Sequence, residues 1–302
     1  VNLSGLLQKL FALHGVLPRY LWRNGRAFRP IHMLVEVTYR CNLRCDFCQY
    51  LDIIEGTAKP FGPSGTRDLE RAQLERIIDE MPWGRLITFA GGETLARKDF
   101  PQILAHAARR HRVHIITNGA LITEGLARTY VDLAPRRIWQ NGLVLLEVSL
   151  QGDEKTHDRV VQRPGSWRAA VDAVEHIVRF RKATGRSFPK LDLKVVVTEN
   201  TVGTMVDFMH LAHRLGVDLV NFLTEHDLVG NAEGGRLENL HRPQRAPRGV
   251  DPAFLRQQLI RCYELERELG LQIRLTPHLP IDEFVRHYGD DRALDRAHYV
   301  CD

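Results

Sequence analysis

Three of the five cysteines in the chain, Cys41, Cys45 and Cys48, lie within eight residues in the stretch TYRCNLRCDFCQY. Thiolates bind zinc and iron–sulfur clusters, and a metal site with only three protein ligands leaves a position open for a further molecule. A secreted disulfide framework would instead spread an even number of cysteines along the chain. The pattern therefore predicts metal binding or catalysis in a reducing compartment, and a cytoplasmic location.

Several kinds of site could need three close thiols. Their spacing also fits one face of a helix, so three buried structural cysteines are one interpretation, but the residues between them share no apolar face. A structural zinc ion would need a fourth ligand, and Cys262 lies in a predicted helix, where we expect it to be a core residue. An iron–sulfur cluster held by three thiolates would leave one iron open to a substrate or cofactor.

The elements that must position the thiols follow a regular order. Short apolar runs predict strands at 32–38, 85–93, 113–119, 143–153, 190–200, 217–225 and 271–275. Helical spacing of apolar residues predicts helices near 3–22, 68–81, 99–110, 123–133, 166–184, 204–215 and 252–269. The strands are continuously apolar, which is typical of parallel strands covered on both faces. About six strand–helix alternations predict an α/β fold, either a barrel or a doubly wound sheet.

The residues that stand out chemically follow the ends of these strands. The cysteines follow the first strand, GGE (91–93) the second, TNG (117–119) the third, SLQG (149–152) the fourth and TEN (198–200) the fifth. Both architectures place their sites at the carboxyl ends of the strands. We therefore expect these motifs to meet at one mouth of the fold, although they are far apart in the chain.

The arrangement Cys-x3-Cys-x2-Cys after a first strand, with Phe47 just before the last cysteine, resembles the radical S-adenosylmethionine (SAM) superfamily. In that family three cysteines hold a [4Fe–4S] cluster, whose fourth iron binds the amino and carboxylate groups of SAM. The resemblance implies an enzyme that cleaves SAM reductively to a 5′-deoxyadenosyl radical, which abstracts a hydrogen atom from the substrate. It also implies an α/β fold, a partial (β/α)6 TIM-type barrel.

The stretch AGGETL (90–95) resembles the family's glycine-glycine-glutamate motif, which meets the methionine amino group of SAM. That role would fall to Gly91, Gly92 and Glu93. Glycines allow a close backbone approach, and a carboxylate suits an ammonium partner. The family has proline at the position of Thr94.

The stretch VSLQGDEKTHDRV (148–160) resembles the family's fourth-strand segment, in which Ser149 would contact the ribose or carboxylate of SAM. Many relatives have aspartate at the position of Gln151 and an arginine that grips the SAM carboxylate at Val161. The full set of SAM contacts that the resemblance implies is Phe47, Gly91, Gly92, Glu93, Asn118, Ser149, Arg159, Arg163 and Asn200, of which Arg159 or Arg163 could replace the missing arginine.

The resemblance divides the chain into an N-terminal helical extension (1–30), a radical SAM partial barrel (31–276) and a C-terminal extension (277–302). The SPASM and twitch subgroups of the family add a cysteine-rich module with auxiliary clusters, and HYVCD, at the end of the sequence, resembles its opening. An auxiliary iron–sulfur cluster would form if the chain continues beyond Cys301; otherwise Cys301 is incidental. We expect no separate leader-peptide-binding domain before residue 31. The segment 226–249 is expected to be a solvated loop or a substrate lid.

Composition limits the possible partners. The 302 residues are 44% hydrophobic and 26% charged, which is ordinary for a globular protein. A net charge of +5 permits an anionic partner without demanding nucleic acid, and no nucleic-acid partner is predicted. No apolar run reaches the roughly 18 residues that a transmembrane helix needs.

The predicted function is radical SAM chemistry on a peptide or small natural-product precursor, with electrons from a donor such as flavodoxin or ferredoxin. A sugar, an aminocyclitol or a lipid is the alternative substrate. Two other classes of protein stay open. One is a non-catalytic iron–sulfur or zinc protein, and the other is a conventional α/β enzyme with a nucleophilic cysteine.

Overall fold

A computed structural model describes residues 13–14, 17–18, 20–21, 28–48, 50–56, 68–225 and 249–289. Its core is one sheet of seven parallel strands that lie side by side in the order of the sequence. The strands are β1 (His32–Glu36), β2 (Leu86–Ala90), β3 (Arg112–Thr117), β4 (Gly142–Ser149), β5 (Lys190–Val197), β6 (Leu219–Thr224) and β7 (Gln272–Thr276).

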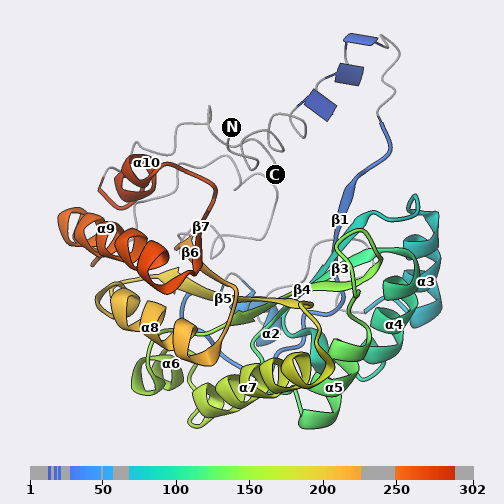
Figure 1. The fold of residues 1–302 in the computed structure, drawn as a ribbon, viewed down its shortest axis with the longest axis horizontal. Coiled ribbons are helices and arrows are strands. Elements are labelled where there is room, and N and C mark those ends of the chain that lie inside the picture. Colours follow the sequence, from blue (N-terminus) through green and yellow to red (C-terminus); the bar gives the residue numbers. More distant parts are fainter. Residues whose placement is uncertain are drawn as a thin grey trace.

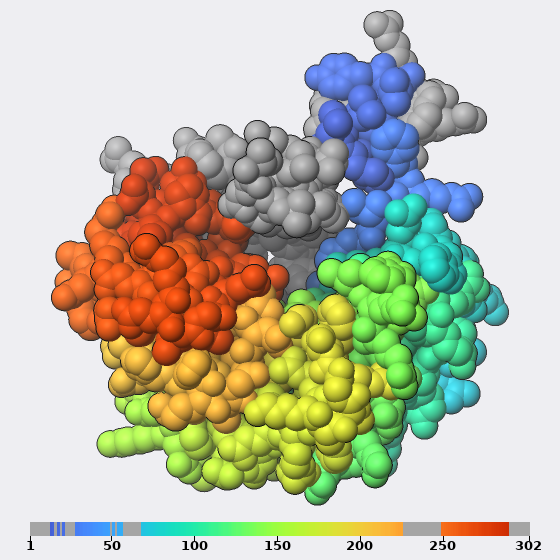
Figure 2. Space-filling view, in the orientation of Figure 1, coloured from blue at the N-terminus to red at the C-terminus, as the bar shows by residue number. Residues whose placement is uncertain are grey.

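Helices follow the strands and cover the outer face of the curved sheet (Figure 1). The α-helices are α2 (Leu51–Ile54), α3 (Arg71–Glu80), α4 (Phe100–Arg110), α5 (Glu124–Asp132), α6 (Glu154–Val160), α7 (Ser166–Thr184), α8 (Met205–Leu215), α9 (Pro252–Leu269) and α10 (Ile281–Arg286). Two short 3-10 helices, η1 (Thr94–Ala96) and η2 (Val202–Thr204), follow β2 and β5. Figure 2 shows the same order as a steady change of colour around the molecule, from α3 to α9.

The sheet is an open barrel. β1 and β7 are its two edges, and within the described residues these edges do not pair with each other. The predicted α/β partial barrel is therefore confirmed, and the six expected strand–helix units are followed by a seventh, β7 with α10. All neighbouring strands are parallel, so β1 to β6 end at the same edge of the sheet. The mouth that the sequence predicts at the carboxyl ends of the strands corresponds to this edge.

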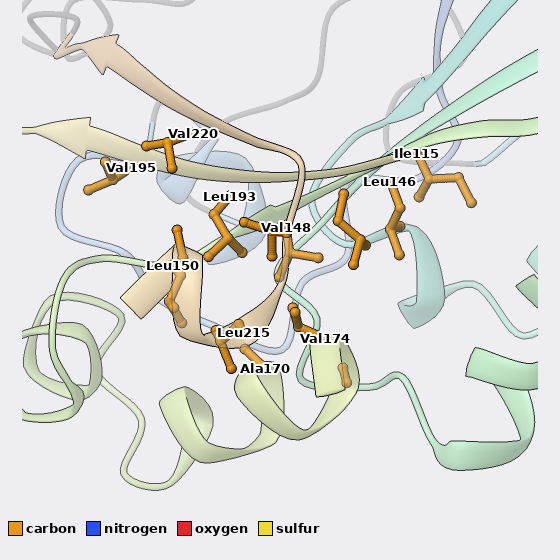
Figure 3. Close-up of a cluster of buried hydrophobic side chains, with 14 of the residues drawn as sticks. Ile115, Leu146, Val148, Leu150, Ala170, Val174, Leu193, Val195, Leu215 and Val220 are labelled. Atoms are coloured by element: carbon orange, nitrogen blue, oxygen red, sulfur yellow. The ribbon is translucent and has the colours of Figure 1, made fainter. Parts of the chain in front are cut away.

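Successive side chains along each strand point alternately to the outer and to the inner face of the sheet. Outward side chains lie under the helices, and Leu146 and Leu193 belong to the same buried cluster as Val174 of α7 (Figure 3). Inward side chains of β3 to β5 include His114, Glu147 and Asp192, which are polar yet buried. The expectation of continuously apolar strands is therefore wrong on the inner face, because that face encloses a polar interior rather than a second layer of helices.

Three short helices were not expected. α2, α6 and α10 have only four, seven and six residues, too few for a clear apolar period. Asp153 begins α6 by accepting a hydrogen bond from the backbone of Thr156 at 2.7 Å. None of the helices in the described part of the chain is both long and apolar enough to cross a bilayer.

Some predictions fall mostly outside the described residues. The six described residues of the expected helix at 3–22 are helical. Residues 57–67, residues 226–248 of the expected loop or lid, and Cys301 are not described. Cys262 is confirmed as a core residue, since it is fully buried in α9.

Candidate active site

The segment that carries the three thiols, residues 41–48, is called the cluster loop here. Its stem continues the β1–β2 ladder past the strand ends. The backbone N–H of Val37 donates to the carbonyl of Ala90 at 3.0 Å, that of Gly92 to Thr38 at 2.8 Å, and that of Glu93 to Arg40 at 2.9 Å. The glycine-glycine-glutamate motif thus holds the start of the cluster loop by its backbone.

The two glycines are needed for this close approach. A Cβ atom on Gly91, whose φ is +134°, would lie 2.2 Å from the carbonyl oxygen of Thr38. A Cβ atom on Gly92 would lie 2.5 Å from the carbonyl oxygen of Arg40 and 2.7 Å from that of Tyr39. No larger residue fits here without moving the stem of the cluster loop.

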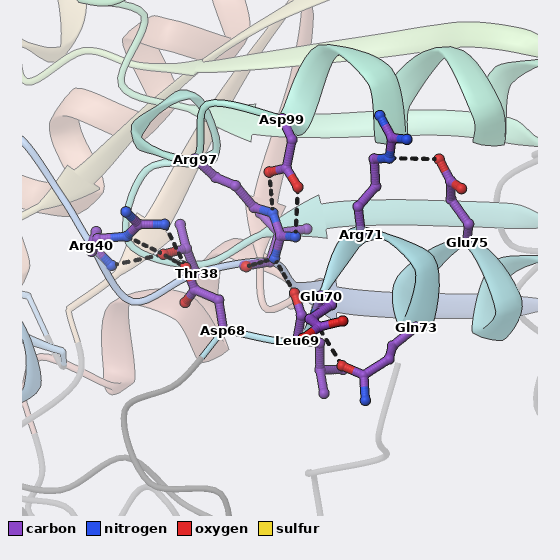
Figure 4. A network of polar contacts seen from close by, with 11 residues as sticks. Thr38, Arg40, Asp68, Leu69, Glu70, Arg71, Gln73, Glu75, Arg97 and Asp99 are labelled. Carbon is purple, nitrogen blue, oxygen red and sulfur yellow. Dashed lines mark hydrogen bonds and ion pairs between the residues drawn. The ribbon is translucent and has the colours of Figure 1, made fainter.

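Side chains brace the stem from below (Figure 4). Thr38 donates through its hydroxyl to Asp68 at 3.0 Å, and Arg40 forms an ion pair with the same carboxylate at 2.6 Å. The buried guanidinium of Arg97 donates to the carbonyls of Val37 at 3.1 Å and Leu69 at 2.7 Å. The end of β1 is therefore fixed to the segment that leads into α3 and to η1.

The far side of the cluster loop rests on α6. The backbone N–H groups of Arg44 and Asp46 donate to the carbonyls of Val161 and Val160, both at 3.1 Å. Leu43 is buried against the same two valines. Many relatives have an arginine that binds SAM at the position of Val161. In this chain the apolar side chain of Val161 packs against the cluster loop instead.

The three thiols face one cavity of about 340 Å³, a volume in the usual range for small-molecule pockets. Burial raises the pKa of all three thiols, so that without a bound metal they hold their protons. Two donors reach the Sγ atom of Cys41, the backbone N–H of Leu43 at 3.4 Å and the Nδ2 atom of Asn118 at 4.0 Å. Such donors stabilise a metal-bound thiolate.

The donors available at the cavity bear on the kind of metal site that they could form. No three Cys, His, Asp or Glu side chains in the described residues are grouped closely enough to hold one metal ion. A single zinc ion would need such a group. A [4Fe–4S] cluster spreads its ligands, because each cysteine sulfur binds a different iron. The donor set therefore fits an iron–sulfur cluster better than zinc.

Glu93 is buried and does not line the cavity. One carboxylate oxygen accepts hydrogen bonds from the backbone of Leu95 at 3.0 Å and from the hydroxyls of Thr117 at 2.8 Å and Thr94 at 3.3 Å. The other accepts from the backbone of Asn118 at 2.7 Å. Burial raises the pKa of Glu93, and these four donors oppose that shift. The side chain thus ties the end of β2 to the end of β3.

The other expected SAM contacts divide into two groups. Most line the cavity, namely Phe47, Gly91, Gly92, Asn118 and Ser149. The remaining three lie outside its lining. Arg159 donates to the Oδ1 atom of Asn200 at 3.0 Å, and Arg163 donates to the carbonyl of Asn42 in the cluster loop at 2.9 Å. The structure thus brings all of them to one end of the sheet but gives them different neighbours.

Gln151, His157 and Lys194 are among the cavity residues that the sequence did not identify as site residues. The Oε1 atom of Gln151 accepts from the backbone of Val196 at 3.0 Å and so joins β4 to β5. The backbone of Gln151 donates to Nδ1 of His157, whose pKa burial lowers to about 4. Lys194 of β5 also lines the cavity. The sequence does contain a signal for Lys194. In KLDLKVVV the charged residues occupy every second position, as expected for side chains on one face of a strand.

Comparisons with known proteins agree with this geometry. The family model described as the radical SAM superfamily matches residues 35–212, more than half of the chain. Mycofactocin maturase MftC of Mycobacterium ulcerans is 32% identical over 196 residues, which cover 63% of this chain and 46% of that protein. PqqA peptide cyclase of Streptomyces rochei is 29% identical over 199 residues, 63% of this chain and 47% of that protein.

The fold is also found in solved structures. Streptococcus suis SuiB bound to S-adenosylmethionine matches with a TM-score of 0.62 at 15% identity, covering 100% of this chain and 62% of that one. The same protein bound to its precursor peptide SuiA matches with a TM-score of 0.60 at 15% identity, over 85% of this chain and 51% of that one.

The alignments show that the chain spans about half the length of the curated relatives it matches. The matched region runs from β1 to α8, and so includes the cluster loop, the glycine-rich end of β2 and the ends of β4 and β5. A family that uses a [4Fe–4S] cluster and SAM accounts for a three-thiol loop held against two glycines. The chain belongs to the radical SAM superfamily.

Proposed function

We propose that Cys41, Cys45 and Cys48 hold a [4Fe–4S] cluster at the mouth of the barrel and that SAM binds beside it in the cavity. When bound, the cluster and SAM supply reductive cleavage of SAM to a 5′-deoxyadenosyl radical that abstracts hydrogen from a substrate. The observation that carries the proposal is the convergence of three thiols, two obligatory glycines and Ser149 on one cavity.

In this proposal different cavity residues contact different parts of SAM. We assign the methionine end to the backbone of Gly91 and Gly92, which lie beside the cluster loop. Asn118 and Ser149 offer polar groups from the ends of β3 and β4. Phe47 supplies an apolar surface, and Arg159, Arg163 and Asn200 would need to turn inward to reach SAM.

Glu93 takes a different role in this proposal from the one that the resemblance implies. Direct contact with the SAM ammonium would require this buried side chain to reach the cavity, which it does not line. We assign Glu93 a positioning role, in which it orients Asn118 and η1 around the SAM site.

We further propose that the substrate is a peptide. Two relatives support this class by their names, a peptide cyclase and a protein solved with its precursor peptide. A sugar, aminocyclitol or lipid is the alternative. The electron donor would be a flavodoxin or ferredoxin, and the odd set of cysteines supports a cytoplasmic location.

Iron content tests the cluster assignment directly. Cys41→Ala, Cys45→Ala and Cys48→Ala should each bring iron from about four per chain to well under one after anaerobic reconstitution. Cys262→Ala is the matched control, because this thiol is buried in α9. It should keep its iron and lose roughly 1 kcal/mol of stability. Full iron in any of the first three variants would remove that cysteine from the ligand set.

A second measurement tests the chemistry. The reconstituted wild-type protein, given SAM and a strong reductant, should form 5′-deoxyadenosine, which mass spectrometry detects. A protein that binds the cluster but neither binds nor cleaves SAM would be an iron–sulfur binding protein, and the proposal would fail.

A further inference from the structure

Four charged residues meet on the inner face of the barrel next to the SAM site. They are Glu147, Asp192, Lys194 and Arg274, called the charged interior here. Lys194 of β5 is the register partner of Ser149 of β4, and one inward step deeper Asp192 is the partner of Glu147. The charged interior therefore begins at the level of an expected SAM contact and continues into the barrel.

Close ion pairs connect these residues. The Nζ atom of Lys194 lies 2.7 Å from Oε1 of Glu147. The Nη2 atom of Arg274 lies 2.6 Å from Oδ2 of Asp192 and 3.5 Å from Oε2 of Glu147. His114 approaches the same oxygen of Glu147 at 3.8 Å. Glu147 thus has two cationic partners, and it does not depend on Lys194 alone.

Lys194 is the member of the charged interior that faces the cavity. Its side chain is 18% exposed, whereas that of Glu147 is 3% exposed. Among the described residues that line the cavity, it is the one with a permanent charge. Its neighbours in the lining include the apolar side chains of Ile116, Val196 and Leu223. A ligand entering the barrel would therefore meet one cation against an apolar wall.

The balance of charge favours an anion over a cation at this place. Burial lowers the pKa of His114 to about 4, so this ring is neutral near pH 7. Burial and the neighbouring Glu147 raise the pKa of Asp192 to about 7. Two cationic side chains, Lys194 and Arg274, therefore face two carboxylates, of which Asp192 is partly protonated near pH 7.

We propose that Lys194 binds a carboxylate of the substrate at the inner end of the cavity, with an apolar group of the substrate against Ile116, Val196 and Leu223. This rests on the proposed function, because it takes the cavity as the place where substrate and SAM meet. The substrate class is thereby narrowed to molecules with a carboxylate next to an apolar side chain, such as a peptide terminus. A charge-assisted contact of this kind changes affinity by about 10-fold or more.

A matched pair of small probes tests the proposal. N-acetyl-leucine carries a carboxylate beside an apolar side chain, and N-acetyl-leucinamide is its neutral counterpart. Ligand-observed NMR would measure both dissociation constants on the reconstituted protein saturated with SAM. We expect the wild type to prefer the acid by about 10-fold, Lys194→Met to lose this preference and Lys194→Arg to keep most of it. Equal dissociation constants of the acid and the amide on the wild type, or no detectable binding of either, would overturn the proposal.

Lys190→Met is the control variant. Lys190 lies on the same strand and pairs with Asp218 at 2.8 Å, and it does not line the cavity. It should keep the preference for the acid. If Lys194 served only as a counter-ion of Glu147, Lys194→Met would lower the melting temperature and leave the preference unchanged, which would also overturn the proposal.

The carboxylate of SAM itself is the other possible partner of Lys194. Dissociation constants of SAM and decarboxylated SAM distinguish the two sources. We expect both to be unchanged within about twofold in Lys194→Met. A selective loss of SAM affinity of about 10-fold would assign Lys194 to the cofactor and overturn the substrate role. Iron content and SAM binding of the wild type are measured first, so failure of the proposed function is recognised separately.

Discussion

The cluster loop and the charged interior lie next to each other but are held in opposite ways. Five backbone hydrogen bonds hold the cluster loop and its stem, three to the end of β2 and two to the end of α6. The charged interior is held by side chains alone, through ion pairs between strands that are not all neighbours. One region depends on the shape of the backbone, and the other depends on the identity of its side chains.

This difference indicates which residues of each region can be substituted without loss of structure. In the cluster loop, the backbone hydrogen bonds do not depend on side-chain identity, so residues other than the cysteines and the buried Leu43 can vary more freely. In the charged interior, every member is another member's partner, and replacing Glu147 or Arg274 leaves Lys194 or Asp192 without its partner in the group. Substitutions can therefore separate the two regions experimentally.

Glu147→Gln should give the largest loss of stability. It removes the carboxylate shared by Lys194 and Arg274, and breaking a buried ion pair costs about 3–5 kcal/mol. We expect about 3 kcal/mol, the lower end, because Lys194 still reaches the cavity. Urea unfolding measures the loss. Iron content should not change, since no hydrogen bond or ion pair among the described residues joins the cluster loop to this group.

The double variant Glu147→Gln with Lys194→Met sharpens this prediction. Replacing both members of a buried pair is often nearly neutral, so the double variant should recover about 1 kcal/mol or more of the loss. Simple addition of the two single losses would mean that the pair is not coupled. Glu268→Gln, in an exposed pair with Arg261, is the control and should cost under about 1 kcal/mol.

Gly92→Ala should have the next largest effect, and here the iron site should change too. The new Cβ atom would lie 2.5 Å from the carbonyl oxygen of Arg40, and overpacking of this kind costs about 1–3 kcal/mol. The stem of the cluster loop must move to relieve the contact, so reconstituted iron should fall. Gly203→Ala, with no neighbour within 4 Å, should leave both stability and iron nearly unchanged.

Taken per pH unit, the smallest effect is a dependence of stability on pH, of about 1 kcal/mol per unit, that the charged interior introduces. Burial raises the pKa of Asp192 from 3.8 to about 7, so the folded protein holds this proton where the unfolded chain has lost it. The free energy of unfolding from this group therefore falls as pH rises from about 4 to about 7. His114 contributes with the opposite sign below pH 6.5, since burial lowers its pKa to about 4.

Asp192→Asn isolates the contribution of Asp192, because the wild type and the variant share His114. The stability of the wild type minus that of the variant should fall by about 1 kcal/mol per pH unit across the same range. A difference that does not vary with pH would mean that Asp192 is already ionised in the folded protein at low pH, beside Arg274, Lys194 and Glu147.

The sequence predicted much of this molecule because local pattern and fold agree in it. The seven strands and the long helices begin and end within a few residues of their expected positions, and the three cysteines fall on one loop. The packing of Gly91 and Gly92 against Thr38 and Arg40 could not be foreseen, because these residues lie some fifty positions away in the sequence. That contact exists only once β1 and β2 pair.

The charged interior was missed for a related reason. Each strand contributes one or two charged residues to an apolar run, and alone such a residue is easily taken for an irregularity. Only the register between strands brings Glu147 opposite Asp192 and Ser149 opposite Lys194. Strict alternation in KLDLKVVV was the available signal that this strand has a polar inner side.

The order of the strands has a consequence for how the protein is made. Each hydrogen-bonded strand pair joins sequence neighbours, so a nascent chain can extend the sheet in the order of its synthesis. Arg274 breaks this local order, because it lies 82 residues after Asp192 and 127 after Glu147. Both carboxylates must therefore wait for the last strand before Arg274 reaches them. The ion pairs of the charged interior are complete only when β7 has joined the sheet, long after the cluster loop has left the ribosome.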